Sequence, residues 1–134
     1  SVRAQVLNLL MDIQEEYGLT YLVVAHDLAI LERTCDRIAV MFLGQIMELT
    51  DSRQLFENPR HPYTKALLSA IPIPDPRAKR THEILQGDVP DPADSPVGCK
   101  FSGRCPLTEE RCFHEEPELK EITPGHHVRC HLVE

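Results

Sequence analysis

The chain has 134 residues, of which 42% are hydrophobic and 26% charged, so it has the size and composition of one ordinary globular domain. Its formal net charge is −7, with 14 Lys and Arg against 21 Asp and Glu, and Trp is absent. Nucleic-acid binding depends on clustered cations and stacking aromatic rings, so this balance argues against that class of partner. The longest apolar run, six residues at 38–43, is far shorter than the roughly 20 needed to cross a bilayer.

Proline divides the chain into two parts. All 11 prolines lie at or after Pro59, whereas the long apolar patterns lie in the first 55 residues. We therefore predict a boundary just before Pro59, with residues 1–57 forming one part and residues 58–134 forming an extension.

The first part is predicted to be a piece of an α/β layer. Residues 2–17 carry apolar side chains at three- and four-residue steps, which indicates a helix capped by Ser1 and ended by Gly18. The apolar, β-branched run at 19–25 indicates a strand covered on both faces, as in a parallel sheet. A short helix over 27–34 is expected to follow.

A predicted hairpin completes this part. Residues 38–43 indicate a second strand buried on both faces, and a tight turn at a glycine leads into a partner strand over 45–49. Asp51 or Ser52 is expected to cap a further short helix. Two strands buried on both faces need covering layers that 55 residues do not supply, so we expect the chain to be the C-terminal part of a larger protein.

The extension is predicted to begin with a helix over 62–71, with Pro62 in the first turn, where proline is tolerated. The preceding His61 could be a ligand or a catalytic residue, but a packing or capping role is favoured because no partner is evident nearby. Closely spaced prolines from Pro72 onward then enforce an extended path. An irregular loop is predicted over 87–98.

His26 is the first residue that could carry chemistry. It directly follows the predicted strand at 19–25, and ligands of open α/β sheets bind at the carboxyl ends of the strands. A neutral histidine there can donate a hydrogen bond to a phosphate oxygen and accept one on its other ring nitrogen. The alternative is a loop residue that bonds locally to Asp27.

Four cysteines of the extension are spaced C-x5-C-x6-C-x17-C, at Cys99, Cys105, Cys112 and Cys130. Structural zinc usually has ligand pairs spaced C-x2–4-C, which neither short gap matches. An iron–sulfur cluster accepts more varied spacing, and Pro106 follows Cys105 as proline follows a ligand cysteine in some ferredoxins. Disulfides or free thiols are the third interpretation, although disulfides are rare in a reducing cytosol.

Other possible ligands are assigned ordinary roles. Four histidines could replace a zinc ligand, but we expect them to be polar loop residues: His114, His126, His127 and His131. Cys35 lies far from the other cysteines and is expected to be a small buried thiol.

Several stretches resemble ATP-binding subunits of ABC transporters. They are SVRAQVL at 1–7, VVAHDL at 23–28 and DRIAVM at 36–41, and their order is similar to the region from after the D-loop, through the H-loop, to the end of the nucleotide-binding core. The stretch NPRHPYTKALL at 58–68 resembles the start of the C-terminal extension in oligopeptide/dipeptide importer subunits.

This resemblance implies that residues 1–57 are the C-terminal, H-loop part of a P-loop ABC ATPase core, and that residues 58–134 are a small, irregular extension. It implies that His26 is catalytic and contacts the γ-phosphate of ATP. It also implies a [4Fe-4S] cluster, with zinc as the alternative, on Cys99, Cys105, Cys112 and Cys130. Because the chain contains no G-x-x-x-x-G-K-[ST] phosphate loop, we expect it not to hydrolyse Mg-ATP alone.

The resemblance further implies the partners and location of the intact protein. They are a second ATP-binding subunit, two transmembrane permease subunits and, indirectly, a solute-binding protein, at the cytoplasmic face of the bacterial inner membrane. The expected function is ATP hydrolysis that drives the import of peptides or a related solute. The competing hypothesis is a stand-alone iron–sulfur or zinc-binding regulatory module.

Overall fold

The structure is a computed structural model that describes residues 2–71 and 95–133, and every structural statement below concerns these residues. The predicted cap Ser1, the closely spaced Pro72, Pro74 and Pro76, and most of the predicted loop at 87–98 lie outside them.

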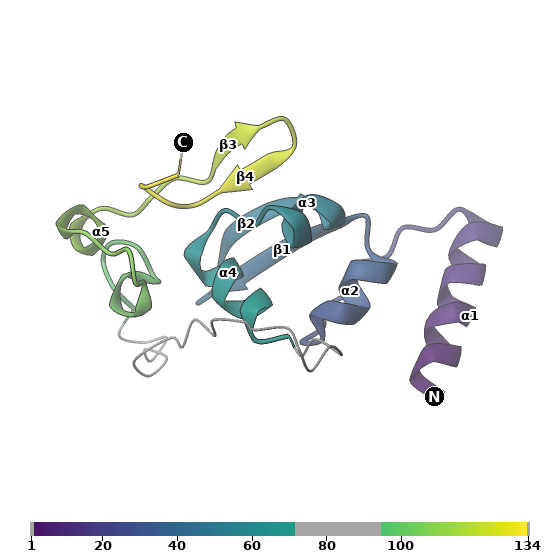
Figure 1. Cartoon of the computed structure of the whole chain (residues 1–134). Coiled ribbons are helices and arrows are strands. Elements are labelled where there is room, and N and C mark those ends of the chain that lie inside the picture. The colour runs from purple at the N-terminus through teal and green to yellow at the C-terminus, as the bar shows by residue number, and fades with distance from the viewer. Residues whose placement is uncertain (1, 72–94, 134) are drawn as a thin grey trace.

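The first part consists of two helices, two strands and a third helix, and the extension again contains helices and strands (Figure 1). The described helices are α1 (Val2–Tyr17), α2 (Leu28–Thr34), α3 (Ser52–Glu57), α4 (Pro62–Ser69) and α5 (Glu110–His114), with a 3-10 turn, η2, over Ser102–Arg104. The described strands are β1 (Arg37–Phe42), β2 (Gln45–Asp51), β3 (Lys120–Thr123) and β4 (His126–Val128). The extension is therefore less irregular than predicted.

The strands form one antiparallel sheet in the order β1-β2-β4-β3. The hairpin β3–β4, drawn in yellow in Figure 1, adds to the edge of β2, so both predicted parts of the chain contribute to one sheet. The parallel sheet inferred from the apolar runs is not present among the described strands, because every described pair runs antiparallel.

Local capping explains where the short helices begin. The Asp27 carboxylate accepts a hydrogen bond of 3.1 Å from the N–H of Ala29 at the start of α2. The Asp51 carboxylate accepts one of 2.9 Å from the N–H of Gln54 at the start of α3. Helix α1 ends at Gly18, whose φ of +62° is the left-handed conformation expected of a C-terminal glycine. The predicted starts of α2 and α3 and the predicted end of α1 are confirmed.

The hairpin β1–β2 is also confirmed. Its turn places Leu43 and Gly44 at φ of 45° and 76°, the positive values that a type I′ two-residue turn needs at both positions. Strand β1 alternates between exposed and buried side chains, so the prediction of a strand covered on both faces is wrong. Ile38 and Val40 pack on helices α2, α3 and α4, and the opposite face carries exposed residues such as Met41.

The predicted strand at 19–25 is wrong for this structure. No strand is assigned there, and Leu22 and Val24 are 95% and 90% exposed. A β-strand is held by backbone hydrogen bonds to a neighbouring strand, and no described strand pairs with this segment. An apolar, β-branched composition alone is therefore not sufficient to form a strand at 19–25.

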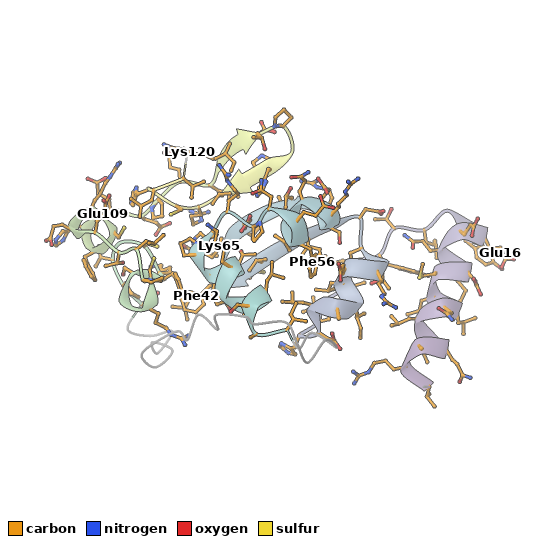
Figure 2. All side chains as sticks on the ribbon, viewed as in Figure 1. Glu16, Phe42, Phe56, Lys65, Glu109 and Lys120 are labelled. Carbon is orange, nitrogen blue, oxygen red and sulfur yellow. The ribbon has the colours of Figure 1, made fainter. Side chains whose placement is uncertain are left out.

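Helix α1 stands apart from the sheet (Figure 1), and none of its residues is buried. Figure 2 shows side chains on both sides of the helix, some of them directed toward α2. The apolar residues of α1 are exposed, Val2 by 75% and Leu9 by 58%. No helix in the described part of the chain has both the length and the apolar character needed to cross a membrane.

Two apolar clusters make up the described core. One joins β1 to α2 and α3 and contains Leu31, Ile38, Val40 and Leu55. The other joins the hairpin β1–β2 to the extension and contains Phe42, Met47, Cys99, Phe101 and Cys112. In the second cluster the rings of Phe42 and Phe101 meet edge to face, with centroids 5.5 Å apart. The extension is thus packed on the hairpin as well as hydrogen-bonded to it.

Candidate functional site

His26 lies on the surface, between the segment 19–25 and helix α2. The neighbouring Asp27 carboxylate accepts hydrogen bonds from the backbone N–H groups of Ala29 and Ile30, and it lies 3.8 Å from the guanidinium of Arg3. Asp27 thus serves as the cap of α2. The contact of His26 with a nucleotide phosphate stays a prediction.

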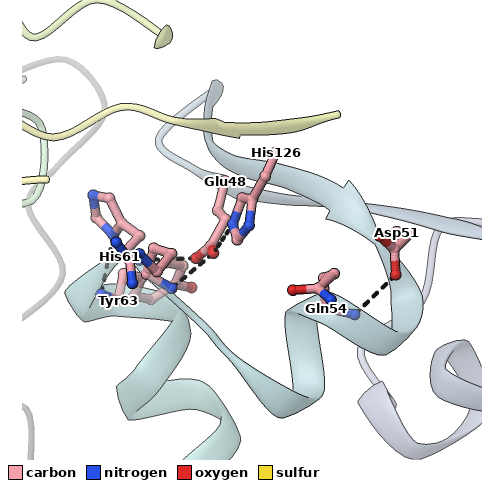
Figure 3. A network of polar contacts seen from close by, with 7 residues as sticks. Glu48, Asp51, Gln54, His61, Tyr63 and His126 are labelled. Carbon is pink, nitrogen blue, oxygen red and sulfur yellow. Dashed lines mark hydrogen bonds and ion pairs between the residues drawn. The ribbon is translucent and has the colours of Figure 1, made fainter. Parts of the chain in front are cut away.

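Glu48 is the centre of a buried polar network that sequence reasoning missed (Figure 3). Its side chain, on β2, is 0% exposed. Oε1 accepts hydrogen bonds of 2.8 Å from the N–H of Arg60 and 2.7 Å from Nε2 of His126, and Oε2 accepts one of 2.9 Å from the N–H of His61. The sequence signal that could have pointed to this network was the carboxylate of Glu48 inside the strand predicted over 45–49. Its partners lie too far along the chain for local patterns to identify them.

His61 caps helix α4, as favoured from the sequence. Its Nδ1 accepts a hydrogen bond of 3.0 Å from the N–H of Tyr63, which assigns the ring proton to Nε2. Burial lowers the pKa of His61 to about 4, although the nearby Glu48 charge and the Arg129 carbonyl oppose this shift. His61 is therefore neutral at physiological pH and serves as a structural hydrogen-bonding group.

The four cysteines of the extension gather in one region, which we call the cysteine lobe (residues 98–114 and 129–132). The N–H of Cys99 donates a 2.8 Å hydrogen bond to the carbonyl of Cys112, and Cys105 packs against the cluster that contains both. Burial is the main cause that raises the pKa of the Cys99 thiol, and the charges of Cys112 and Cys130 raise it further. Burial likewise raises the pKa of Cys105 and Cys130. Cys99, Cys105 and Cys130 therefore each lie close enough to another cysteine of the lobe for its charge to raise their pKa.

The chemistry of this donor set suits a metal centre, because four thiols of one lobe can supply thiolate ligands. However, no three or more His, Cys, Asp and Glu side chains in the described ranges are arranged to hold a metal ion. The structure therefore does not confirm either the iron–sulfur or the zinc prediction. Cys35 lies elsewhere, half-buried beside α2 and α3, and is separate from the lobe as predicted.

Comparison with known proteins decides the family. Residues 47–112 match the family model described as the C-terminal region of oligopeptide/dipeptide transporters. A putative peptide import ATP-binding protein of Brucella ovis is 52% identical over 130 residues, which cover 97% of this chain and 41% of that protein. Residues 47–112 therefore belong to the family of oligopeptide/dipeptide transporter C-terminal regions, and nearly the whole chain is similar to peptide-import ATP-binding proteins.

Other transport ATP-binding proteins match equally far along the chain. The putative oligopeptide transport ATP-binding protein YkfD of Bacillus subtilis is 52% identical over 134 residues, covering 98% of this chain and 41% of that protein. The oligopeptide transport ATP-binding protein AppF of the same organism is 48% identical, with the same coverage. The chain thus spans about two fifths of the length of these curated relatives.

The matched family region contains most of the buried network and most of the cysteine lobe, but not His126. Glu48 and His61 lie within residues 47–112, as do Cys99, Cys105 and Cys112, whereas His26 and Cys130 lie outside that range. The family model therefore covers only part of the contact between the hairpin β1–β2 and the extension, because Phe42 and strand β4 lie outside the matched residues.

Gly98 is a requirement of the cysteine lobe in this family member. A Cβ atom at this position would lie 2.3 Å from the carbonyl oxygen of Cys112 and 2.7 Å from the carbonyl carbon of Phe113. Backbone atoms cannot move aside as a flexible side chain can. Only glycine lets this segment approach α5 closely enough for Cys99 to bond to Cys112.

Three of the four histidines predicted to be loop residues have hydrogen-bond partners, whereas Nδ1 of the fourth, His127 on β4, is buried without one in the part of the chain that the structure describes. His114 pairs with Glu110 at 2.9 Å on the surface of α5, and Nε2 of His131 lies 2.9 Å from the carbonyl oxygen of Glu115. His131 is a polar loop residue, as expected, whereas His114 differs from the prediction because it is the last residue of α5. His126 departs from the prediction, because it lies buried on β4 and bonds to Glu48 rather than occupying a loop.

Proposed function

We propose that the protein containing this chain is the ATP-hydrolysing subunit of an ABC-type importer of peptides, and that this chain is its C-terminal part. The observation that carries the proposal is the 52% identity over 97% of the chain to a putative peptide import ATP-binding protein. The stand-alone metal-binding module receives no support, because the similarity to ATP-binding proteins runs through both parts of the chain.

In this proposal His26 is the catalytic residue of this part of the protein and contacts the γ-phosphate of Mg-ATP. Its exposed position supports this role, because a phosphate contact requires an accessible ring nitrogen. A hydrogen bond from histidine would stabilise the charge that develops on the transferred phosphoryl group and help to position the attacking water. The remaining nucleotide-binding groups would come from other segments of the longer protein.

The intact importer would combine this subunit with a second ATP-binding subunit and two transmembrane permease subunits, at the cytoplasmic face of the inner membrane. A solute-binding protein would deliver the solute. The names of these relatives, which are peptide and oligopeptide transport proteins, favour peptides as the solute. Experiments are needed to distinguish dipeptides, oligopeptides and nickel chelates as the transported solute.

Cys99, Cys105, Cys112 and Cys130 are the residues we propose to hold a [4Fe-4S] cluster, with zinc as the alternative metal. Their gathering in the cysteine lobe supports this assignment. A metal bound by four thiolates would crosslink segments that contain few large apolar side chains. Such a crosslink contributes to folding directly, so a structural role is the default for the site.

Uptake measurements in the organism test the proposed function. A strain that lacks the gene should lose accumulation of radiolabelled dipeptides or oligopeptides, and a plasmid copy should restore it. Loss of nickel uptake with normal peptide uptake would assign a different solute. Normal uptake of all these solutes would contradict the proposed function.

A further inference from the structure

We propose that Glu48 acts as a latch that fastens β4 to the sheet and thereby positions Cys130 beside the other three cysteines. The Glu48 latch consists of Glu48 and its three donors, which are the N–H groups of Arg60 and His61 and the ring of His126. It concerns how the extension is held on the hairpin, which goes beyond the proposed import function and depends on neither ATP hydrolysis nor a bound metal.

One carboxylate joins three segments in this latch. Glu48 belongs to β2, Arg60 and His61 precede helix α4, and His126 begins β4 (Figure 3). A buried carboxylate is costly unless hydrogen bonds replace the water it has lost. Glu48 is 0% exposed, so its burial is favourable only when these donors are in place. The docking of β4 is therefore coupled to the position of the α4 N-terminus.

The backbone pairing that the latch supports is short. Strand β4 has three residues, and its register on β2 consists of Glu48 opposite Val128 and Leu49 opposite His127. Beyond this register, the N–H of Arg129 donates a 2.8 Å hydrogen bond to the carbonyl of Met47. So short a strand gains much of its stability from side-chain contacts, and the His126–Glu48 bond is buried within it.

The same strand supports both halves of the cysteine lobe. Met47 packs in the cluster that contains Cys99 and Cys112, and its carbonyl accepts the hydrogen bond from Arg129, the residue before Cys130. The adjacent Glu48 holds His126, four positions before Cys130. If β4 is released, Cys130 leaves with it, whereas Cys99 and Cys112 keep their own contacts with Met47. Arg129 adds a contact of its own, because its Nε donates a 3.0 Å hydrogen bond to the carbonyl of Ile46, so the latch and Arg129 together hold the fourth thiol beside the other three.

Site-resolved thiol labelling of the full-length, metal-free protein under anaerobic conditions tests this inference. Iodoacetamide labelling of each cysteine is followed by mass spectrometry in the wild type and in His126→Leu, His126→Gln and His114→Gln. We expect His126→Leu to raise the labelling rate of Cys130 about tenfold or more, because local opening of β4 becomes easier. His126→Gln, which retains a side-chain N–H donor, should restore most of the protection. His114→Gln changes an exposed histidine and should have no effect.

A second variant and a second readout separate a latch from general instability. Glu48→Gln keeps the shape of the side chain but cannot accept all three hydrogen bonds, so it should also expose Cys130. In His126→Leu the amides of Arg60 and His61 should keep their slow hydrogen exchange, because Glu48 still accepts from them. Unchanged Cys130 labelling in both variants would overturn the proposal. Equal increases at Cys35 and Cys130 would also overturn it, since they would indicate global unfolding.

Discussion

Nε2 of His126 lies 2.7 Å from Oε1 of Glu48, and these two buried residues are 78 positions apart in the chain. One belongs to the hairpin of the first predicted part and the other to the last strand of the extension. The extension is therefore joined to the hairpin through a polar contact inside the protein as well as through apolar packing. Removing either partner leaves buried hydrogen-bonding groups without a partner.

Replacing Glu48 by alanine should strongly destabilise the protein. The change leaves the ring of His126 and the N–H groups of Arg60 and His61 without their acceptor, and loss of one partner of such a buried network costs about 3–5 kcal/mol. Urea unfolding followed by circular dichroism measures the free energy of unfolding. Glu57→Ala is the control, because its ion pair with Arg53 is exposed and should contribute less than about 1 kcal/mol. Equal effects of both substitutions would contradict the network.

Gly98→Ala should disturb the cysteine lobe, whereas Gly103→Ala should not. The new Cβ at position 98 would overlap the backbone of Cys112 and Phe113, while at position 103 it would meet no atom within 4 Å. Overpacking of this kind costs about 1–3 kcal/mol and would weaken the hydrogen bond between Cys99 and Cys112. Denaturant unfolding and hydrogen exchange at the Cys99 amide measure both effects. If the two variants were equally stable, the close approach at Gly98 would be wrong.

The free energy of unfolding should fall as the pH drops from about 6.5 to about 4, because of His61. Burial lowers its pKa to about 4 in the folded protein, so over this range the unfolded chain binds a proton that the folded one does not. The difference between the ordinary pKa of 6.5 and the folded-state pKa of about 4 corresponds to about 3 kcal/mol of unfolding free energy. His61→Asn keeps a capping oxygen for helix α4 but does not titrate. The variant should therefore show a weaker pH dependence in urea titrations, and an unchanged dependence would exclude His61 as its source.

The 134-residue chain by itself should self-associate. Helix α1 buries none of its residues, and the neighbouring Leu22 and Val24 are almost fully exposed, so many large apolar side chains face solvent. Apolar surfaces of this kind normally lie in interfaces. Light scattering at rising protein concentration should show growing particles, and Val6→Glu with Leu10→Glu should reduce them. A wild-type chain that stays monomeric at high concentration would contradict this expectation.

Local signals predicted the elements that depend on neighbouring residues. Asp27 and Asp51 marked helix starts, and Gly44 marked the hairpin turn, because capping and turn formation act within a few positions. The run at 19–25 failed because a strand also requires a partner strand, which composition does not reveal.

The buried network could not be predicted in the same way. Glu48 meets Arg60 and His61 across a change of direction in the chain and meets His126 through sheet pairing. No periodic pattern encodes either contact. Four cysteines in a short extension suggest a shared site, but that site stays a prediction, because in the described ranges no three such side chains are arranged to hold a metal ion. The close approach at Gly98 that the cysteine lobe requires became evident only in three dimensions.

ATP hydrolysis by the full-length protein, assembled with its membrane subunits, tests the central claim most directly. Turnover and Mg-ATP affinity should be measured for the wild type and for His26→Ala. We predict that the wild type hydrolyses ATP, and that the variant loses about a hundredfold in turnover while its affinity for Mg-ATP changes little, because the missing hydrogen bond acts mainly on the transition state. No hydrolysis by the assembled wild type would contradict the proposed function, and unchanged turnover in His26→Ala would remove this residue from the catalytic site.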